Sequence, residues 1–199
     1  QLSNDFHVRK VMTNYLPNDE ESKHYACLLQ WDNIYYQPPT QEYLAPKTTV
    51  RVGLVQWQMR SYKTLDDLFE QVEFFVDAVS DYKSDFVLFP EYFNAPLMSK
   101  YNDKGESQAI RGLAQYTEEI RDRFINLAIS YNINIITGSM PLIKEDGLLY
   151  NAGFLCRRDG TYEMYEKLHV TPDEIKSWGL SGGKQLKTFE TDCAKIGIL

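Results

Sequence analysis

The chain contains few cysteines and histidines, the residues that form disulfide bonds and most zinc sites. Its 199 residues include three cysteines and three histidines. These are Cys27, Cys156 and Cys193, and His7, His24 and His169. The cysteines are widely spaced and odd in number, which argues against a disulfide framework and predicts reduced thiols in a cytoplasmic protein. The histidines have no paired spacing, so the sequence does not predict a zinc site.

Long apolar runs and an excess of basic residues are also absent. No stretch approaches the roughly 20 apolar residues needed to cross a bilayer. Residues 1–5 have neither the basic start nor the apolar stretch of a secretory signal. The 28 acidic residues exceed the 21 lysines and arginines, which gives a net charge of -7. Because nucleic-acid binders usually present a basic face, we expect neither a nucleic-acid nor a membrane partner.

What is present is an ordinary globular composition with unusual ends. Hydrophobic residues make up 43% and charged residues 25% of the chain, which is enough for one sizeable core. The chain begins with Gln1, and residues 194–199 form an apolar run typical of a core strand. A native terminus rarely lies within a core strand, so we interpret the sequence as a fragment of a longer protein.

Proline-rich sequence marks a division of the chain near residue 45. Residues 32–47 contain three prolines among polar residues and tyrosines, which is typical of an extended linker. Before it, residues 6–12 alternate like a strand, and a helix is predicted from residue 19 to about residue 30. We therefore expect two parts, residues 1–45 and residues 46–199.

Residues 46–199 alternate between strand and helix patterns. The predicted strands are residues 50–57, 85–89, 133–137, 148–156, 160–165, 186–189 and 195–199. The predicted helices are residues 65–79, with apolar residues at helical spacing, and residues 116–131. Alternating strands and helices followed by hairpins indicate an α/β fold with a largely parallel core.

Two charged residues follow predicted strands and could form one site. Glu91 comes just after the buried strand at residues 85–89, where open α/β sheets place their chemistry. Lys167 follows the strand at residues 160–165. A carboxylate and an ammonium at two strand ends predict a site that moves protons beside a fixed positive charge. Taken singly, each residue is also typical of an ordinary solvated surface charge.

Six short motifs resemble the first half of a carbon-nitrogen hydrolase of the nitrilase superfamily. They are VGLVQ (52–56), FPEYF (89–93), ITGS (136–139), YNA (150–152), YEKLH (165–169) and FET (189–191). Their order and spacing also resemble that family. The resemblance implies a nitrilase-like four-layer α-β-β-α sandwich, of which residues 46–199 would be the incomplete first half. It also implies a small amide or nitrile as substrate and a possible homo-oligomer.

The same resemblance assigns roles to individual residues. Glu91 falls on the family's general base, Lys167 on the lysine of its Glu-Lys-Cys triad, and Glu174 on a second glutamate beside the site. The family's cysteine follows the strand that corresponds to residues 195–199, so it would lie just past the end of this chain. No residue present takes its role. Residues 171–174 also fit an ordinary helix start with acidic residues in the first turn.

These residue types suit the hydrolysis of a carbon–nitrogen bond. A thiolate is a stronger nucleophile than water once a carboxylate such as Glu91 has taken its proton. An ammonium such as Lys167 can stabilise the charge that develops on the attacked group. This chemistry needs no metal or other cofactor. Without the cysteine, we expect the present chain to be inactive by itself.

Residues 1–45 carry a second, weaker resemblance. They resemble the end of an N-acetyltransferase of the GNAT type, as in proteins that fuse such a domain to a carbon-nitrogen hydrolase. Residues 4–10 and 14–16 would be its last strands, while the glycine loop that cradles pyrophosphate in that family is not in this sequence. Two alternatives to a hydrolase remain open. In the first, the longer protein is chiefly an amine N-acetyltransferase with a hydrolase-like binding or regulatory module. In the second, the chain is a half-domain that acts as a scaffold or oligomer partner.

Overall fold

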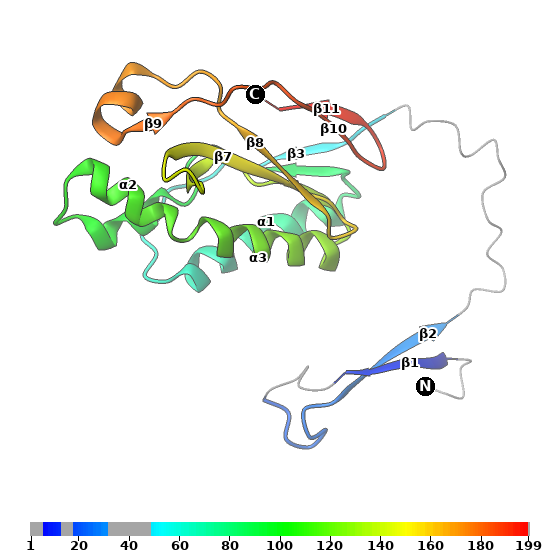
Figure 1. Cartoon of the computed structure of the whole chain (residues 1–199). Coiled ribbons are helices and arrows are strands. Elements are labelled where there is room, and N and C mark those ends of the chain that lie inside the picture. Colours follow the sequence, from blue (N-terminus) through cyan, green and yellow to red (C-terminus); the bar gives the residue numbers. More distant parts are fainter. Residues whose placement is uncertain (1–5, 13–17, 32–48, 199) are drawn as a thin grey trace. The chain divides into compact units, whose positions relative to one another are not determined.

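The computed structural model describes residues 6–12, 18–31 and 49–198. The chain divides into two compact units, Gln1–Ala45 and Pro46–Leu199 (Figure 1). The first unit contains a β-hairpin, and the second contains a large sheet with helices. None of the helices in the described ranges has the length and apolar character needed to span a membrane.

The first unit is a hairpin of two strands. β1 (Phe6–Met12) pairs antiparallel with β2 (Ala26–Trp31). The strand predicted at residues 6–12 is confirmed. The helix predicted from residue 19 to about residue 30 is wrong, because its first half consists of turns and its second half is β2.

The turns before β2 explain why the acidic residues do not start a helix. Lys23 and His24 have φ angles of 51° and 67°, in the left-handed region that an α-helix does not use. The Asp19 side chain accepts a hydrogen bond from the Ser22 amide at 3.2 Å. The Asp19 carbonyl accepts another from the His24 amide at 3.0 Å. Asp19 thus closes a turn through contacts that resemble those of a helix N-cap. The residues after the turn form β2, which pairs with β1, and do not form a helix.

The second unit is built on one seven-stranded sheet. Its strand order is β3-β4-β5-β7-β6, and β8 and β9 also pair with β7. The strands are β3 (Val52–Leu54), β4 (Phe86–Leu88), β5 (Asn134–Ile136), β6 (Met140–Ile143), β7 (Leu149–Cys156), β8 (Tyr162–Glu166) and β9 (Leu180–Ser181). The prediction of a largely parallel core is confirmed only in part: β3, β4 and β5 pair in parallel, whereas β5, β6 and β8 each pair antiparallel with β7. The predicted hairpin is β7 and β8. β6 escapes prediction because Pro141 interrupts a strand of four residues.

Helices cover one face of this sheet (Figure 1). They are α1 (Leu65–Asp81), the 3-10 helix η3 (Ala95–Tyr101), α2 (Glu106–Ala114) and α3 (Thr117–Ser130). The helices predicted at residues 65–79 and 116–131 are confirmed as α1 and α3. α1 begins with a capping box, in which the Thr64 side chain accepts from the Asp67 amide at 3.1 Å and the Asp67 carboxylate accepts from the Thr64 amide at 3.0 Å.

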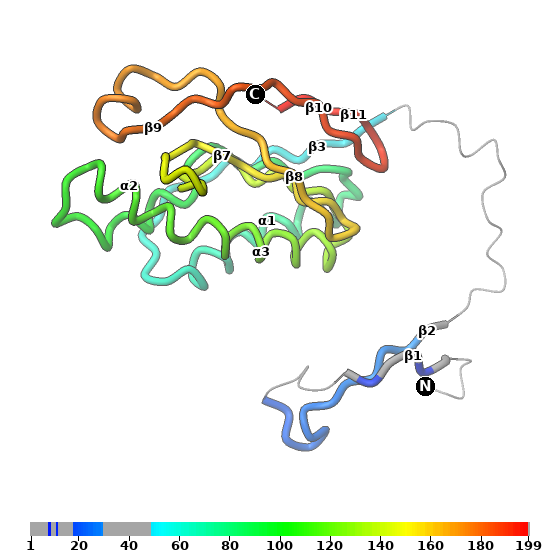
Figure 2. The backbone as a smooth tube through the Cα atoms, viewed as in Figure 1, coloured from blue at the N-terminus to red at the C-terminus, as the bar shows by residue number. Residues whose placement is uncertain are grey.

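The last part of the chain covers the opposite face. Figure 2 shows the chain leaving β8, passing outward through the π-helix η4 (Glu174–Trp178) and β9, and returning as β10 (Thr188–Glu190) and β11 (Lys195–Gly197). Among the described strands, β10 and β11 pair only with each other. The core strand predicted at residues 195–199 is therefore corrected. Residues 195–197 form one strand of a separate two-stranded sheet and are only partly buried, and residue 199 lies outside the described residues.

The sheet has an apolar core on each face. On the helical side, the ring centroids of Phe124 lie 5.4 Å from Phe69 and 5.1 Å from Phe89. A smaller cluster on the other side consists of Phe86, Ile136, Leu155, Tyr165 and Phe189. Ile196 and Ile198 pack against this smaller cluster, so it holds the β10–β11 hairpin on the sheet. Strands buried on both faces need no polar alternation, which is why β4 reads as a continuous apolar run.

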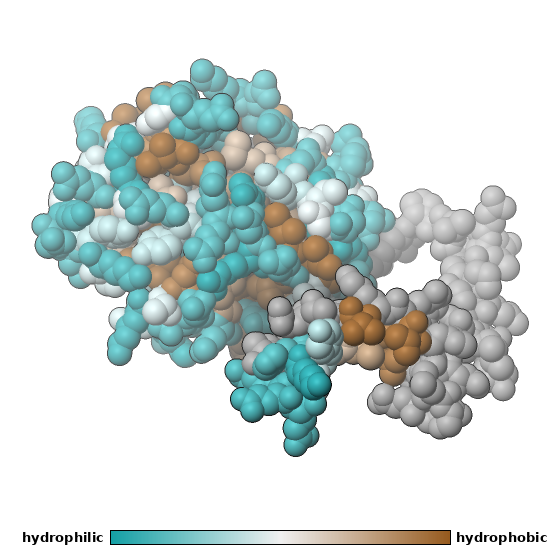
Figure 3. Space-filling model, turned by 60° about the horizontal axis from the view of Figure 1, so that its bottom comes forward, coloured by the Kyte–Doolittle hydropathy of each residue, from teal (hydrophilic) through white to brown (hydrophobic). Residues whose placement is uncertain are grey.

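The outer surface of the helical layer is mostly hydrophilic. Figure 3 turns this side of the second unit forward and shows polar residues interrupted by scattered hydrophobic ones. Phe74 on α1 and Ile129 on α3 are among the exposed hydrophobic residues. The helices therefore direct their apolar faces to the sheet, as amphipathic helices do.

Candidate active site

The carboxyl ends of β4 and β5 fix the position of Glu91. Beyond β4, the Phe89 amide donates to the Ile136 carbonyl at 3.0 Å. On the other side of Glu91, the Tyr92 amide donates to the Ser139 carbonyl at 2.8 Å. The main chain of Glu91 is therefore anchored on both sides to the segment that leaves β5.

Gly138 allows these two strand ends to approach each other. Its φ angle of 72° lies in the left-handed region that favours glycine. A Cβ atom at this position would lie 2.2 Å from the Pro90 carbonyl oxygen. Because the obstacle is backbone, it cannot rotate away as a side chain would. The turn that carries Glu91 thus depends on a glycine in the neighbouring segment.

Lys167 reaches Glu91 from the end of β8. Its amide donates to the Asn151 carbonyl at 2.8 Å, which continues the pairing of β8 with β7. Its Nζ lies 3.0 Å from Glu91 Oε1, although the two residues are 76 positions apart in the sequence. The fold thus brings together the carboxylate and the ammonium that follow separate strands.

Glu174 binds the same ammonium. Lys167 Nζ lies 2.9 Å from Oε1 and 3.2 Å from Oε2 of Glu174. The Thr171 amide donates to Glu174 Oε2 at 2.7 Å, and the side chain of this glutamate is nearly buried, with 7% of the residue exposed. Glu174 is also the first residue of η4. Both interpretations of the sequence therefore fit its place: it starts a helix and it contacts Lys167.

The surrounding groups hold these charges in place. Burial lowers the pKa of Lys167, but hydrogen bonds with Glu174 and Glu91 outweigh burial and raise that pKa above its usual value. Burial raises the pKa of Glu174, but hydrogen bonds from Lys167 and Thr171 reverse this effect and hold the pKa below its usual value. Around neutral pH, Lys167 is therefore an ammonium and Glu174 a carboxylate.

Sequence reasoning assigns no role to Asn151, which the structure places against Glu91. Asn151 lies on β7 and is 1% exposed, and its Nδ2 donates to Glu91 Oε1 at 2.5 Å. All eight residues of β7 are buried, so an amide in this strand needs a polar partner. An asparagine within a largely apolar strand is the signal that could have identified this residue.

The site borders a cavity of about 560 Å³. Its lining includes Glu91, Tyr165, Lys167, His169, Gly197 and Ile198. The last two residues belong to β11 and to the position directly after it. The last described part of the chain therefore reaches the cavity that holds the carboxylate and the ammonium.

Two neutral phenols flank the carboxylates. Burial raises the pKa of Tyr92, and the charges of Glu174 and Glu91 add to this effect. Burial and the charge of Glu91 likewise raise the pKa of Tyr165. The Tyr92 hydroxyl is buried and has no hydrogen-bond partner among the described residues. Both phenols therefore stay protonated at neutral pH.

The cavity lining includes none of the three cysteines. Cys156 is buried, and burial raises its pKa to about 12. It lies five positions beyond Asn151 on β7, a separation of roughly 16 Å along a strand. Burial raises the pKa of Cys193 as well, and its sulfur contacts Thr191. Among the described residues, there is also no group of three or more histidine, cysteine, aspartate or glutamate side chains that could hold a metal ion.

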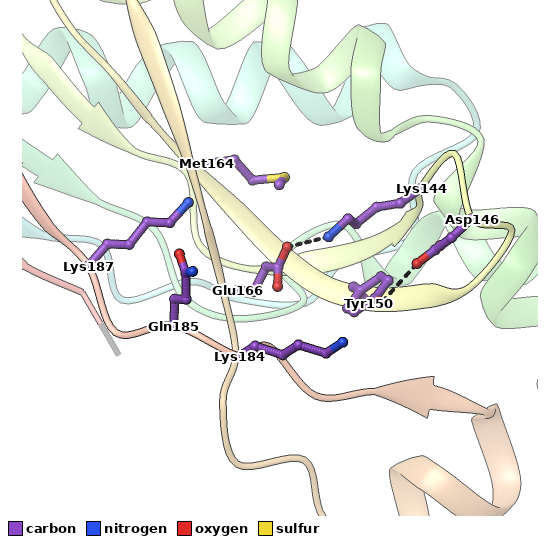
Figure 4. Close-up of a pocket in the computed structure, with 8 residues that line it drawn as sticks. All are labelled: Lys144, Asp146, Tyr150, Met164, Glu166, Lys184, Gln185 and Lys187. Carbon is purple, nitrogen blue, oxygen red and sulfur yellow. Dashed lines mark hydrogen bonds and ion pairs between the residues drawn. The ribbon is translucent and has the colours of Figure 1, made fainter.

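A second cavity, of about 380 Å³, has a different character (Figure 4). It is lined by Lys144, Asp146, Tyr150, Met164, Glu166, Lys184, Gln185 and Lys187. Lys144 Nζ lies 2.7 Å from Glu166 Oε1, and none of the predicted site residues lines this cavity. Side chains alternate along a strand, so Glu166 and Lys167 point to opposite faces and border different cavities.

Comparison with known proteins assigns the family. Residues 51–199 match the model of the family described as carbon-nitrogen hydrolase. The chain belongs to the carbon-nitrogen hydrolase family. This carbon-nitrogen hydrolase chain is 43% identical over 199 residues to "Probable hydrolase YhcX" of Bacillus subtilis (strain 168). The match covers 100% of the chain and 39% of that relative, so the chain spans less than half of the relative's length.

Solved structures related to this carbon-nitrogen hydrolase chain share its fold. A carbon-nitrogen hydrolase from Helicobacter pylori G27 gives a TM-score of 0.62 at 18% identity, over 74% of this chain and 50% of that one. An amidase from Nesterenkonia sp. gives 0.60 at 18% identity, over 74% and 54%. Saccharomyces cerevisiae Nit3, a member of branch 10 of the nitrilase superfamily, gives 0.55 at 22% identity, over 74% and 54%. The fold class predicted from the sequence, a nitrilase-like α/β fold, is confirmed.

Proposed function

We propose that this chain supplies the general base and the lysine of a hydrolase that cleaves non-peptide carbon–nitrogen bonds in small amides or nitriles. One observation carries the proposal. At the wall of a cavity, Lys167 Nζ lies 3.0 Å from Glu91 and 2.9 Å from Glu174. A carboxylate that can exchange protons, held beside a permanent positive charge, is what acyl transfer to a thiol requires.

The first half of the reaction forms an acyl-enzyme. Glu91 takes the proton of a cysteine thiol, and the thiolate sulfur bonds to the amide carbonyl carbon. The carbonyl oxygen gains negative charge, which the Lys167 ammonium stabilises. The carbon–nitrogen bond then breaks, and Glu91 returns its proton to the leaving nitrogen. The products of this half are an amine, or ammonia, and a thioester.

The second half repeats the proton transfers with water. Glu91 takes a proton from a water molecule, whose oxygen bonds to the thioester carbon. The carbon–sulfur bond breaks, and the sulfur recovers its proton from Glu91. One water is consumed, and one carboxylic acid is released. In this scheme Glu174 holds the Lys167 ammonium in place and touches no reacting atom.

The nucleophile in this proposal is a cysteine that follows Leu199 in the longer protein. Gly197 and Ile198 line the same cavity as Glu91, which supports a position of the next residues close to it. Cys156 and Cys193 do not line the cavity, and burial raises the pKa of both thiols. On this proposal, residues 1–199 by themselves have no hydrolase activity.

The proposal is tested by hydrolysis of a panel of small amides and nitriles with the full-length protein. Glu91→Gln removes the base and Lys167→Ala removes the positive charge. Each should lower kcat/KM by at least about a hundredfold, because general-base catalysis typically contributes at least that much and the loss of one group that stabilises the oxyanion has a similar effect. The matched controls are Glu166→Gln and Lys144→Ala, which break the carboxylate–ammonium pair of the second cavity.

The controls should keep nearly full activity, and circular dichroism should show that all four variants fold. Unchanged rates in Glu91→Gln or Lys167→Ala would overturn the proposed roles. A full-length wild-type protein that hydrolyses no member of the panel would count against the function itself.

We further propose that residues 1–45 are the end of an N-acetyltransferase domain of the GNAT type in the longer protein. β1 supports this, because it overlaps residues 4–10 of the resemblance, whereas residues 14–16 lie outside the described residues. This domain would also allow an alternative function, in which amine N-acetylation is the main activity of the longer protein and the hydrolase-like part is a binding or regulatory module. A glycine loop encoded upstream of Gln1, with acetyl-CoA binding by the full-length protein, would support it. A cysteine after Leu199 with amide hydrolysis favours the first proposal.

A further inference from the structure

Both donors that hold the Glu91 side chain bind the same carboxylate oxygen. Asn151 Nδ2 lies 2.5 Å and Lys167 Nζ 3.0 Å from Glu91 Oε1. Every hydrogen bond that the described residues give to the Glu91 side chain ends on this atom. The other oxygen, Oε2, receives no hydrogen bond from the described residues, and Glu91 lines the cavity.

Resting on the proposed function, we propose that Asn151 is a positioning residue for Glu91. Together with Lys167 it binds Oε1, which fixes the carboxylate plane and makes Oε2 the oxygen that accepts and returns the proton. Lys167 alone cannot do this, because its ammonium sits on a flexible stem and is shared with Glu174. The amide of Asn151 adds a second, directional donor.

The place of Asn151 in the fold makes it a rigid support. It is the third of the eight residues of β7, a strand that pairs with both β6 and β8, and Pro141 of β6 is its direct partner. Its carbonyl also accepts the Lys167 amide at 2.8 Å. One residue therefore holds Lys167 through its main chain and Glu91 through its side chain. Because Asn151 is held in a paired strand, it restricts the position of the Glu91 carboxylate more than a residue on a loop would.

The contrast in burial shows why Glu91 needs such support. The Glu91 side chain is 45% exposed, whereas Asn151 is 1% exposed. A half-exposed carboxylate samples several rotamers unless a fixed donor selects one, and ordering the reacting group before the reaction lowers the barrier. Without Glu91, the buried amide of Asn151 would lose its hydrogen-bond partner. The two side chains therefore stabilise each other's position.

The test compares Asn151→Ala and Asn151→Asp with wild type in the full-length protein, by kcat and KM for an amide that wild type hydrolyses. Asn151→Ala should lower kcat by about ten- to a hundredfold, the effect of one hydrogen bond to a charged group. KM should change by less than about threefold, because the residue positions the base and does not bind the substrate.

Asn151→Asp keeps the size of the side chain but replaces the amide by a carboxylate. It should lower kcat at least as far as Asn151→Ala, because it removes the donor and places a second carboxylate against Glu91. This nearly isosteric variant serves if Asn151→Ala fails to fold. The matched control is Asn134→Ala, which removes another buried asparagine, whose Nδ2 bonds to Asp192 at 2.9 Å. The control should change the melting temperature but not kcat.

The outcomes separate this inference from the proposed function. An active wild type whose kcat is unchanged in both Asn151 variants overturns the positioning role and leaves the proposed function intact. A rise in KM that matches or exceeds the fall in kcat in both variants also overturns it, since a residue that positions the base acts on kcat. A wild type with no amide hydrolysis removes the proposed function, and this inference with it.

Discussion

At the scale of single residues, the site contains two glutamates that share one lysine but differ in their surroundings. Glu174 is nearly buried and has three hydrogen bonds to its carboxylate, two from Lys167 and one from Thr171. Glu91 is about half exposed, lines the cavity and accepts hydrogen bonds on only one of its two oxygens from the described residues. Identical chemical groups can take different roles when their environments differ. Here the environments support Glu91 as the base and Glu174 as the support for the lysine.

Glu174→Gln should reduce the acid sensitivity of folding. The Glu174 pKa is held below its usual value of 4.5, so this group stabilises the fold above that value, and the contribution is lost as pH falls through the lower folded-state pKa. Wild type should therefore lose more stability than the variant between about pH 6 and about pH 3. The measurement is the urea midpoint of the full-length protein at both pH values. The exposed Glu145→Gln is the control, and equal losses in wild type and Glu174→Gln would contradict the prediction.

The sequence identified the charged residues of the site but not the amide that completes it. Glu91 and Lys167 follow strands, and strand ends in α/β folds converge at one edge, so their meeting could be expected from local patterns. Asn151 lies inside a strand, where its polarity reveals that it needs a partner but not which one. Its contact with Glu91 depends on the register of β7 against its neighbours, which no local pattern specifies.

At the scale of elements, the approach of two strand ends places Glu91, and one glycine permits it. Gly138 and Gly147 have nearly equal φ angles, 72° and 75°. A Cβ on Gly138 would lie 2.2 Å from the Pro90 carbonyl oxygen, whereas a Cβ on Gly147 would meet nothing within 4 Å. Substitution of Gly147 therefore reports the cost in stability of the backbone conformation alone, and substitution of Gly138 adds the cost of the close approach to Pro90.

Gly147→Ala should lower the free energy of unfolding by about 1 kcal/mol, the usual effect of placing alanine at positive φ. Gly138→Ala should lower it by at least about 2 kcal/mol, because the Pro90 turn must also move. It should reduce amide hydrolysis as well, since the same turn carries Glu91. Urea unfolding and initial rates of the full-length variants measure both effects. Equal losses of stability would show that the close approach adds nothing.

Long elements could be predicted from the sequence and short ones could not. The apolar spacing of α1 persists over several turns, so residues 65–79 predict it directly. α2 has nine residues and β6 has four, too few to establish a period. The helix predicted from residue 19 is wrong for another reason. Its acidic start is also a turn signal, and pairing with β1 decides between the two.

At the scale of the whole second unit, the two apolar faces of the sheet have different tasks. The helices complete the main core, and the β10–β11 hairpin packs against the smaller cluster on the other face. Gly197 and Ile198, at the end of this hairpin, line the cavity of Glu91. The smaller cluster therefore links the packing of the sheet to the shape of the site. The sequence predicted β10 and β11 as strands. It did not predict that they pair with each other and pack on the main sheet, because that packing depends on residues far away in the sequence.

Phe189→Ala should destabilise this unit by about 3–5 kcal/mol, the usual result of emptying a buried aromatic position. Phe189 is 1% exposed, whereas Phe74, the control, is 66% exposed on α1. Phe74→Ala should change stability by less than about 0.5 kcal/mol. Unfolding free energies of the full-length protein provide the comparison. If Phe189→Ala behaves like Phe74→Ala, the hairpin does not pack on the sheet as described.

Glu166 ends β8 and Lys167 follows it, so the sign of the charge beside Glu91 depends on the register of β8 against β7. A slip of this register by one residue would turn the Glu166 carboxylate toward Glu91 and Glu174 and the Lys167 ammonium to the opposite face. Three carboxylates would then repel one another where one cation now binds two of them. Within the described residues, the loop between β7 and β8 contacts none of these side chains, but its turn helps to fix the register that places them.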